Sequence, residues 1–99
     1  MKEISLGTLE EWIRSGVAFQ LIDVREPEEH ALDNIGGLLI PLDEIMQRSG
    51  EILSDGPVVF YCKRGIRSQI AIQRLSRVND SRKFYNLTGG IYSRTMNRK

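Results

Sequence analysis

Apolar residues along the chain form short runs that alternate with segments of helical spacing. Four runs, at 21–24, 38–40, 58–61 and 84–87, predict buried strands, because each is short and is bounded by polar or turn-forming residues. The run at 58–61 is the strongest, and the turn Asp55-Gly56-Pro57 precedes it. The pattern therefore predicts strands buried in a parallel sheet.

Three segments with apolar residues at helical spacing predict one helix before the first of these strands and two between them. The first has Thr8 as its N-cap, with Glu11 completing a capping box, and Gly16 ends it. The second covers 42–49 and ends at Gly50. The third follows the strand at 58–61 after a short loop. Its apolar face consists of Ala71, Leu75 and Val78.

Strands that alternate with helices predict an α/β domain with a mostly parallel sheet and right-handed crossovers. The 99 residues fit one domain, 1–99, whose core needs no disulfide or metal for stability. We expect fraying only in the basic tail, from about Ser93.

Composition and the absence of targeting signals limit the possible classes of protein. No secretory signal follows Met1, and no apolar run approaches the roughly 18 residues of a membrane span. We therefore expect a cytoplasmic protein that does not bind membranes. One cysteine and one histidine argue against a four-ligand zinc site, so no metal is expected.

Charge is distributed unevenly, although the formal net charge is only +1. Residues 1–57 carry twelve acidic and four basic residues, a net charge of −8, whereas residues 58–99 carry ten basic residues and one acidic residue, a net charge of +9. Either these charges intermix on one surface, or a positive face around Cys62 attracts anions or an acidic protein. Nucleic-acid binding is not expected, because no aromatic–basic interleaving accompanies the charge.

The single cysteine, Cys62, directly follows the strongest predicted strand and begins a short loop that leads into a helix. Ligands of open α/β sheets bind beyond the carboxyl ends of strands. Helix N–H groups and three cationic side chains, at positions 63, 64 and 67, would lower the pKa of the thiol. The alternative is a buried cysteine that acts as a small hydrophobe. The position between strand and helix favours a nucleophile.

The other loop residues have separate expected roles. Gly65 permits a positive φ or a close backbone approach, so that loop N–H groups face inward. Arg67 offers a fork for two oxygens of an oxyanion, and Lys63 and Arg64 steer a small anionic substrate. Ser68 either donates its hydroxyl to the thiolate or caps the helix. The predicted site thus comprises the nucleophile Cys62 and the loop residues Lys63, Arg64, Gly65, Ile66, Arg67 and Ser68.

Six motifs occur in one order between about Ile4 and Ile91. They are Asp23-Val24-Arg25-Glu26-Pro27-Glu28-Glu29-His30, Ile35-Gly36-Gly37-Leu38, Ile40-Pro41-Leu42, Val58-Val59-Phe60-Tyr61-Cys62, Gly65-x-Arg67-Ser68 and Asn86-Leu87-x-Gly89-Gly90. In this order and at these spacings they resemble the single-domain rhodaneses, which are sulfurtransferases. The resemblance implies a rhodanese-like fold, with a mostly parallel central sheet of about five strands flanked by helices on both faces.

Loop length separates two enzyme classes that use a cysteine and an arginine. Four residues lie between Cys62 and Arg67. Low-molecular-weight and tyrosine phosphatases have five residues there, which form a cradle the size of phosphate, whereas the rhodanese family uses the shorter loop. The spacing favours sulfur transfer over phosphoryl transfer.

The resemblance implies that Cys62 takes a sulfane sulfur from thiosulfate or a persulfide and holds it as a persulfide. The acceptor is then cyanide, a small thiol or a protein thiolate, and no metal or organic cofactor takes part. The donor and acceptor, including a protein partner in either role, stay open, as does the oligomeric state. Two alternatives are a non-catalytic rhodanese-like interaction module and a small cysteine-dependent phosphatase or arsenate reductase.

Asp23 and Arg25 match supporting positions of the family at a strand end near the loop. We expect a buried Asp23 that accepts hydrogen bonds from loop amides, and an Arg25–Glu29 pair that fixes the turn. His30 is interpreted as a surface or packing residue without a chemical role.

Two departures from the family pattern stand out. Asn34 and Gly36 replace a histidine and a proline, which loosens that turn. After Gly90 the chain is polar, where the family commonly continues with an apolar helix. We expect this difference to leave Cys62 more open to a protein partner.

Overall fold

A five-stranded parallel sheet forms the centre of the molecule in the computed structural model, which describes residues 1–53, 55–78 and 83–96. The strand order is β1-β5-β4-β2-β3, and every neighbouring pair is parallel. This arrangement confirms the predicted α/β sheet. The strands are β1 (Lys2–Ile4), β2 (Gln20–Asp23), β3 (Leu38–Leu39), β4 (Val58–Tyr61) and β5 (Phe84–Leu87).

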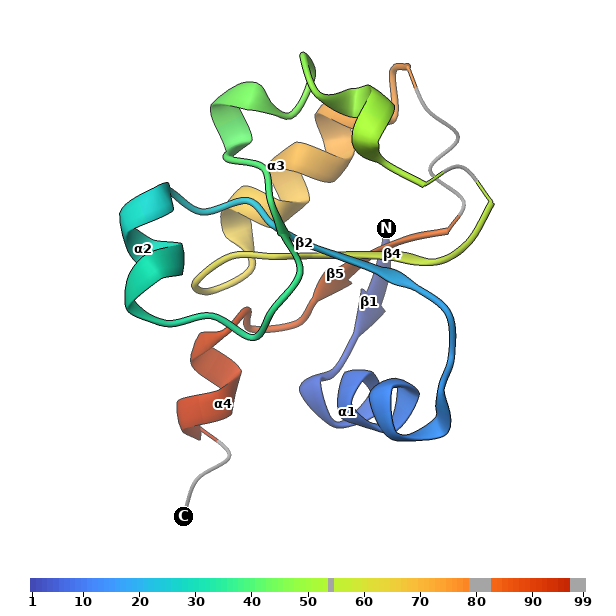
Figure 1. Cartoon of the computed structure of the whole chain (residues 1–99), viewed down its shortest axis with the longest axis vertical. Helices are drawn as coiled ribbons and strands as arrows, with labels where there is room; N and C mark the ends of the chain where they lie inside the picture. The colour runs from blue at the N-terminus through green and yellow to red at the C-terminus, as the bar shows by residue number, and fades with distance from the viewer. Residues whose placement is uncertain (54, 79–82, 97–99) are drawn as a thin grey trace.

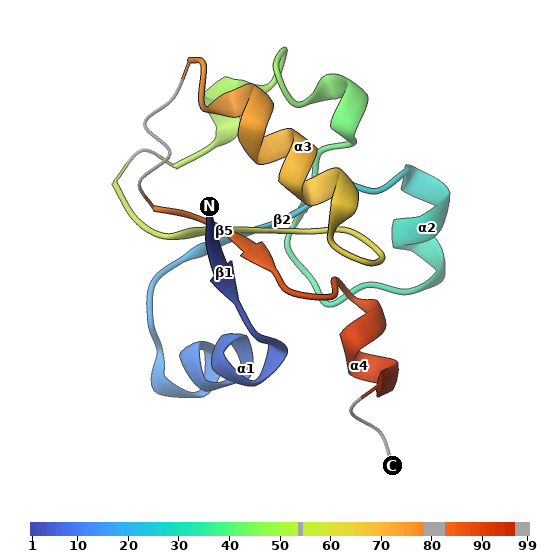
Figure 2. The same cartoon turned by 180° about the vertical axis from the view of Figure 1, so that it is seen from behind.

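Helices cover both faces of this sheet, as predicted. Figures 1 and 2 show α3 and the two 3-10 segments on one face and α1 with α4 on the other, while α2 lies to one side. No helix within the described ranges is long and apolar enough to cross a lipid bilayer. The helical segments are α1 (Leu6–Ser15), α2 (Pro27–Leu32), η1 (Leu42–Glu44), η2 (Ser49–Glu51), α3 (Ile66–Leu75) and α4 (Tyr92–Met96).

The central strand β4 contributes side chains to the core on both faces of the sheet, because successive residues of a strand point in opposite directions. Phe60 packs on the α3 side, where its ring centroid lies 5.1 Å from that of Phe84. Val59 and Tyr61 belong to the cluster on the α1 side. Cys62 continues the alternation and faces the α3 side. Burial on both faces explains why the run at 58–61 is continuously apolar.

The crossover connections leave β2 and β4 in opposite directions, since β2 leads to the edge strand β3 and β4 leads to β5 on the other side. A crevice forms where such connections diverge, outside the carboxyl ends of the two strands. Asp23 of β2 is in register with Tyr61 of β4. The segments that follow these residues, which carry Arg25 and Cys62, therefore begin side by side.

The first helix begins earlier than the sequence predicts. Ser5 is its N-cap, and Ser5 Oγ accepts a hydrogen bond from the Thr8 N–H at 3.1 Å. The predicted N-cap Thr8 is wrong, because it lies inside the helix, whereas Gly16 ends the helix as predicted. The spacing from Thr8 to Glu11 matches a capping box, so sequence alone could not reject it.

Other boundaries also differ. Two 3-10 segments, η1 and η2, replace the single helix predicted over 42–49. Ile45 is fully buried in this region, whereas Met46 is 39% exposed. Val78 lies beyond the end of α3 and is 61% exposed. Residues Tyr92–Met96 form α4, and the fraying predicted from about Ser93 stays a prediction, because residues 97–99 lie outside the described ranges.

Substituting the two possible N-caps tests where α1 begins. Ser5→Ala should lower the free energy of unfolding by about 1 kcal/mol, because the Thr8 N–H loses its acceptor. Thr8→Ala removes an exposed hydroxyl and should change that energy by less than about 0.5 kcal/mol. Urea unfolding of both variants measures the difference. A larger loss for Thr8→Ala would place the N-cap at Thr8.

Candidate active site

The sulfur of Cys62 lies at the carboxyl end of β4, inside a loop that turns back around it. The Gly65 N–H donates to Cys62 Sγ at 3.1 Å, and Ser68 Oγ lies 3.5 Å from the same sulfur. Gly65 has a φ of +98°, a left-handed value that glycine adopts without strain, and it is the N-cap of α3. Cys62 itself is only 1% exposed. The sulfur is therefore surrounded by loop and helix groups.

Local hydrogen bonds lower the pKa of the Cys62 thiol. Burial of the thiol acts to raise its pKa, but hydrogen bonds from the Ser68 side chain and from the backbone N–H groups of Ser68, Gly65 and Arg64 outweigh burial. The direction agrees with the sequence prediction. The cause differs in part, because the stabilising groups are dipoles at the start of α3 more than cationic side chains.

The turn after β5 packs against the backbone of the active loop at Cys62 and Lys63. A Cβ added to Gly90 would lie 2.4 Å from the Cys62 carbonyl oxygen and 2.6 Å from that of Lys63, so glycine is required there. The Ile91 N–H donates to Cys62 O at 2.8 Å, and the Tyr92 N–H donates to Lys63 O at 2.9 Å. Gly90 therefore allows the turn to approach the backbone of the active loop closely. The segment after Gly90 therefore packs against the active loop.

Ser68 and Asn86 form a buried polar pair beside the sulfur. The Ser68 hydroxyl donates to Asn86 Oδ1, and Asn86 Nδ2 donates to Glu3 Oε1 at 3.3 Å. One hydroxyl proton cannot serve two acceptors, so Cys62 Sγ and Asn86 Oδ1 compete for it. Ser68 does not cap the helix, because Gly65 is the N-cap. Sequence reasoning did not assign Asn86 to the site, although a polar residue within an apolar strand was a usable signal.

Arg67 binds a carboxylate of the chain itself. Its Nη1 and Nη2 donate to Glu29 Oε1 and Oε2 at 2.6 and 2.9 Å. The hydrogen bonds with Arg67 are the main cause that lowers the pKa of Glu29 to about 2. The predicted Arg25–Glu29 pair is therefore wrong, and the fork expected to receive an oxyanion is occupied by Glu29.

Asp23 and Arg25 pair with each other at the end of β2. Arg25 Nη2 lies 2.9 Å from Asp23 Oδ2, and the Arg25 N–H donates to Asp23 Oδ1 at 3.0 Å. Both side chains are buried. Burial acts to raise the pKa of Asp23, but the hydrogen bonds from Arg25 and His30 leave it lowered. His30 Nδ1, 2.8 Å from Asp23 Oδ2, belongs to this cluster, which sequence reasoning did not recognise.

The remaining loop side chains point away from the sulfur. Arg64 and Lys63 are exposed, and the Arg64 guanidinium lies 4.3 Å from the centroid of the Tyr92 ring. Ile66 is 66% exposed. The loop therefore presents two cations and one apolar side chain to solvent, while Gly65 and Ser68 contact the sulfur.

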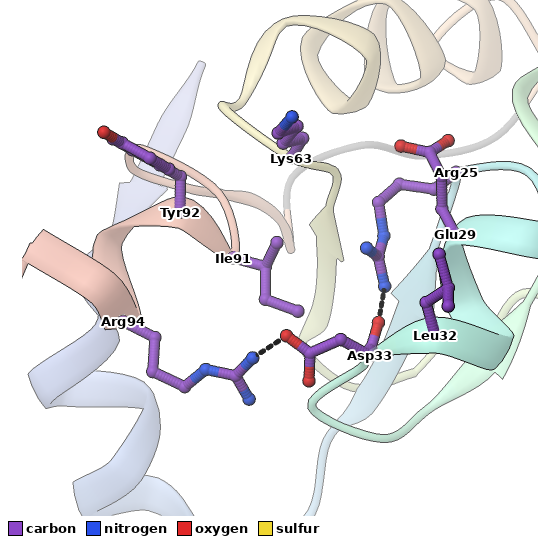
Figure 3. Close-up of a pocket in the computed structure, with 8 residues that line it drawn as sticks. All are labelled: Arg25, Glu29, Leu32, Asp33, Lys63, Ile91, Tyr92 and Arg94. Atoms are coloured by element: carbon purple, nitrogen blue, oxygen red, sulfur yellow. Dashed lines mark hydrogen bonds and ion pairs between the residues drawn. The ribbon is translucent and has the colours of Figure 1, made fainter.

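A cavity of about 240 Å³ opens between α2, α4 and the active loop (Figure 3). An ion pair between Arg94 and Asp33 joins α4 to the segment after α2, and Arg25 Nη2 donates to the Asp33 carbonyl oxygen at 2.6 Å. These contacts close one side of the cavity. Its lining consists of Arg25, Glu29, Leu32, Asp33, Lys63, Ile91, Tyr92 and Arg94.

The arrangement around Cys62 suits nucleophilic chemistry. Cys62 lies at the end of a buried strand, and an N–H group directed at its sulfur stabilises negative charge there. The hydrogen bonds to this sulfur lower the pKa of Cys62 from its ordinary value and so favour the thiolate, which is the nucleophilic form.

Comparison with known proteins shows similarity over nearly the whole chain. The sequence model of the rhodanese-like domain family matches residues 5–95 of this chain. The uncharacterized protein YqhL of Bacillus subtilis is 47% identical over 84 residues, which cover 83% of this chain and 66% of YqhL, just under two thirds of its length. A sulfurtransferase of Allochromatium vinosum is 35% identical, with 92% of this chain and 85% of that protein covered. The structure of the human single-domain sulfurtransferase TSTD1 superposes with a TM-score of 0.76 at 27% identity, covering 100% of this chain and 98% of that one.

Ser68→Ala tests the source of the lowered thiol pKa. Without the hydroxyl, the pKa of Cys62 should rise, and the unpaired Asn86 Oδ1 should cost about 1–3 kcal/mol of stability. The pH dependence of alkylation by iodoacetamide measures the pKa. Ser76→Ala, which removes a hydroxyl from the other end of α3, serves as the control. An unchanged pKa in Ser68→Ala would show that the hydroxyl does not stabilise the thiolate.

Asp23→Asn tests the buried ion pair. The variant should lose about 3–5 kcal/mol of unfolding free energy, because Arg25 would stay buried without its partner charge. The folded-state pKa of Asp23 is lowered, so its contribution is present above the unfolded pKa of about 3.9 and is lost as the pH falls through the folded value. Urea unfolding at several pH values, with the exposed Asp43→Asn as control, measures both effects. Equal stability of the two variants would contradict a structural role for the pair.

Proposed function

This chain belongs to the rhodanese-like domain family, and we propose that it is a sulfurtransferase that carries a sulfane sulfur as a persulfide on Cys62. The observation that carries the proposal is the position of Cys62 Sγ, which accepts a hydrogen bond from the Gly65 N–H next to the start of α3. The lowered pKa of this thiol favours the thiolate form that the reaction needs. A relative with 85% of its length covered is named a sulfurtransferase.

In the first step, the Cys62 thiolate attacks the outer sulfur of thiosulfate or of a persulfide donor. A new S–S bond forms at Cys62, while the S–S bond of the donor breaks and its electron pair leaves with sulfite or with the donor thiolate. The Cys62 persulfide then carries one negative charge on its outer sulfur. The N–H groups of Arg64 and Gly65, which stabilise the thiolate, are suited to support this anion as well.

In the second step, cyanide, a small thiolate or a protein thiolate attacks the outer sulfur of the persulfide. The new bond forms to the acceptor, and Cys62 leaves as a thiolate, so neither step needs a proton, a metal or an organic cofactor. Leaving is easier for a thiol of low pKa. We propose that Lys63 and Arg64, which are exposed at the loop, attract an anionic donor or an acidic partner protein.

The cytoplasm is the compartment that suits this chemistry, because thiols stay reduced there and a disulfide would consume the nucleophile. Phosphoryl transfer fits the geometry less well. A phosphatase loop needs an arginine fork free for phosphate oxygens, and Arg67 binds Glu29 instead.

Sulfur loading followed by intact mass tests the function. Incubation with thiosulfate or glutathione persulfide should add the mass of one sulfur atom, cyanide should remove it as thiocyanate, and Cys62→Ser should abolish loading. Because Cys62 is the chain's single cysteine, the added mass reports this residue alone. If no donor loads Cys62, the enzyme proposal is wrong. A partner complex unaffected by Cys62→Ser would then indicate a binding module, and aryl-phosphate hydrolysis dependent on Cys62 would indicate a phosphatase.

A further inference from the structure

The guanidinium of Arg67 lies in the first turn of α3, five residues after the nucleophile, yet both of its Nη atoms are directed at Glu29. The two residues come from helices on opposite sides of the crevice, α2 and α3. A carboxylate and an oxyanion offer the same pair of oxygens to a guanidinium fork. Glu29 therefore occupies the position at which Arg67 would bind an oxyanion.

The carboxylate of Glu29 is held in place by α2 as well as by Arg67. Its Oε1 accepts the Glu26 N–H at 3.0 Å, as part of the capping box of this helix. Its pKa of about 2 keeps it ionised throughout the neutral range. The helix N-terminus thus fixes a permanent negative charge beside Arg67.

Solvent reaches both members of this ion pair. The side chains of Arg67 and Glu29 are 32% and 31% exposed, so an anion can approach the guanidinium and compete with the carboxylate. Arg67 is also close enough to Cys62 for the charge on the sulfur to contribute to its raised pKa, after the larger effect of Glu29. Glu29 therefore controls how much positive charge is available near the reacting sulfur.

We propose that Glu29 is a specificity-determining residue that competes with oxyanion donors for Arg67 and disfavours dianions such as thiosulfate relative to donors with less charge near the reacting sulfur. The inference rests on the proposed sulfur transfer at Cys62, and it assigns the choice of donor to α2. Glu29→Gln removes the charge but keeps an acceptor for the Glu26 N–H, because glutamine also completes a capping box.

Alkylation of Cys62 measures anion recruitment without any sulfur transfer. Iodoacetate and iodoacetamide both form an S–C bond at the thiolate and release iodide, but only iodoacetate carries a charge. In Glu29→Gln, the ratio of the iodoacetate rate to the iodoacetamide rate should rise roughly two- to fivefold, as expected for a partly exposed ion pair. Taking the ratio cancels any change in the thiolate fraction.

Two variants show whether the gain passes through Arg67. Glu28→Gln makes the same charge change one residue earlier, at an exposed position of the same helix turn, and should leave the ratio near that of the unaltered chain. The double variant Glu29→Gln/Arg67→Gln should lose the gain. An equal rise in Glu28→Gln would assign the effect to net charge, and an unchanged ratio in Glu29→Gln would overturn the proposal.

Donor loading then connects this ratio to sulfur transfer. The rate of Cys62 loading from thiosulfate should rise in Glu29→Gln by more than the rate from cysteine persulfide, which has no sulfonate group. Equal effects on both donors would contradict the specificity role. The two proposals can fail separately. Sulfur loading tests sulfur transfer at Cys62, whereas the alkylation ratio tests the competition between Glu29 and anions for Arg67 and needs no sulfur transfer.

Discussion

The parallel pairing of β2 with β4 is the constraint on which the candidate site depends. Its register places Asp23 beside Tyr61, so the chain leaves both strands at one edge of the sheet. One departing segment carries the Asp23–Arg25 pair and the other carries Cys62. The pairing is secured by burial of β4 on both faces, which makes the position of Cys62 a consequence of core packing.

Backbone dipoles and ion pairs act on different groups in this structure. The sulfur of Cys62 is stabilised by backbone N–H groups that the fold of the loop itself directs inward. The nearby arginines are engaged elsewhere, since Arg25 binds Asp23 and Arg67 binds Glu29. A pKa shift that arises from backbone dipoles persists when ionic strength changes, because the dipoles act at contact distance.

The uneven charge of the chain has a related explanation. The pairs Arg67–Glu29 and Arg94–Asp33 each join the basic half of the sequence to the acidic half. At these points the charges of the two halves intermix on one surface, which is the first of the two possibilities considered from the sequence. Lys63 and Arg64 stay exposed at the active loop. They are the residues that would form the second possibility, a positive face around Cys62.

Local patterns in the sequence were sufficient to predict the α/β class, the strands at 58–61 and 84–87, and a cysteine at a strand end before a helix. These features depend on residues close in sequence, through burial, glycine conformation and helix starts. Helix boundaries were harder, because Ser5 and Thr8 both fit a capping pattern and only the packed helix distinguishes them.

The sequence by itself predicted Cys62 as a candidate nucleophile, the loop that surrounds it and four of the five strands, but it predicted neither β1 nor α2. The tertiary structure alone decided the partners of the charged side chains. Glu29 is 38 residues from Arg67 and only four from Arg25, yet it binds Arg67, because α2 and α3 meet across the crevice. Asn86 of β5 likewise contacts Ser68 of α3 only because the helix packs on the sheet beside this strand. Pairings between distant residues follow from packing, which no local pattern encodes.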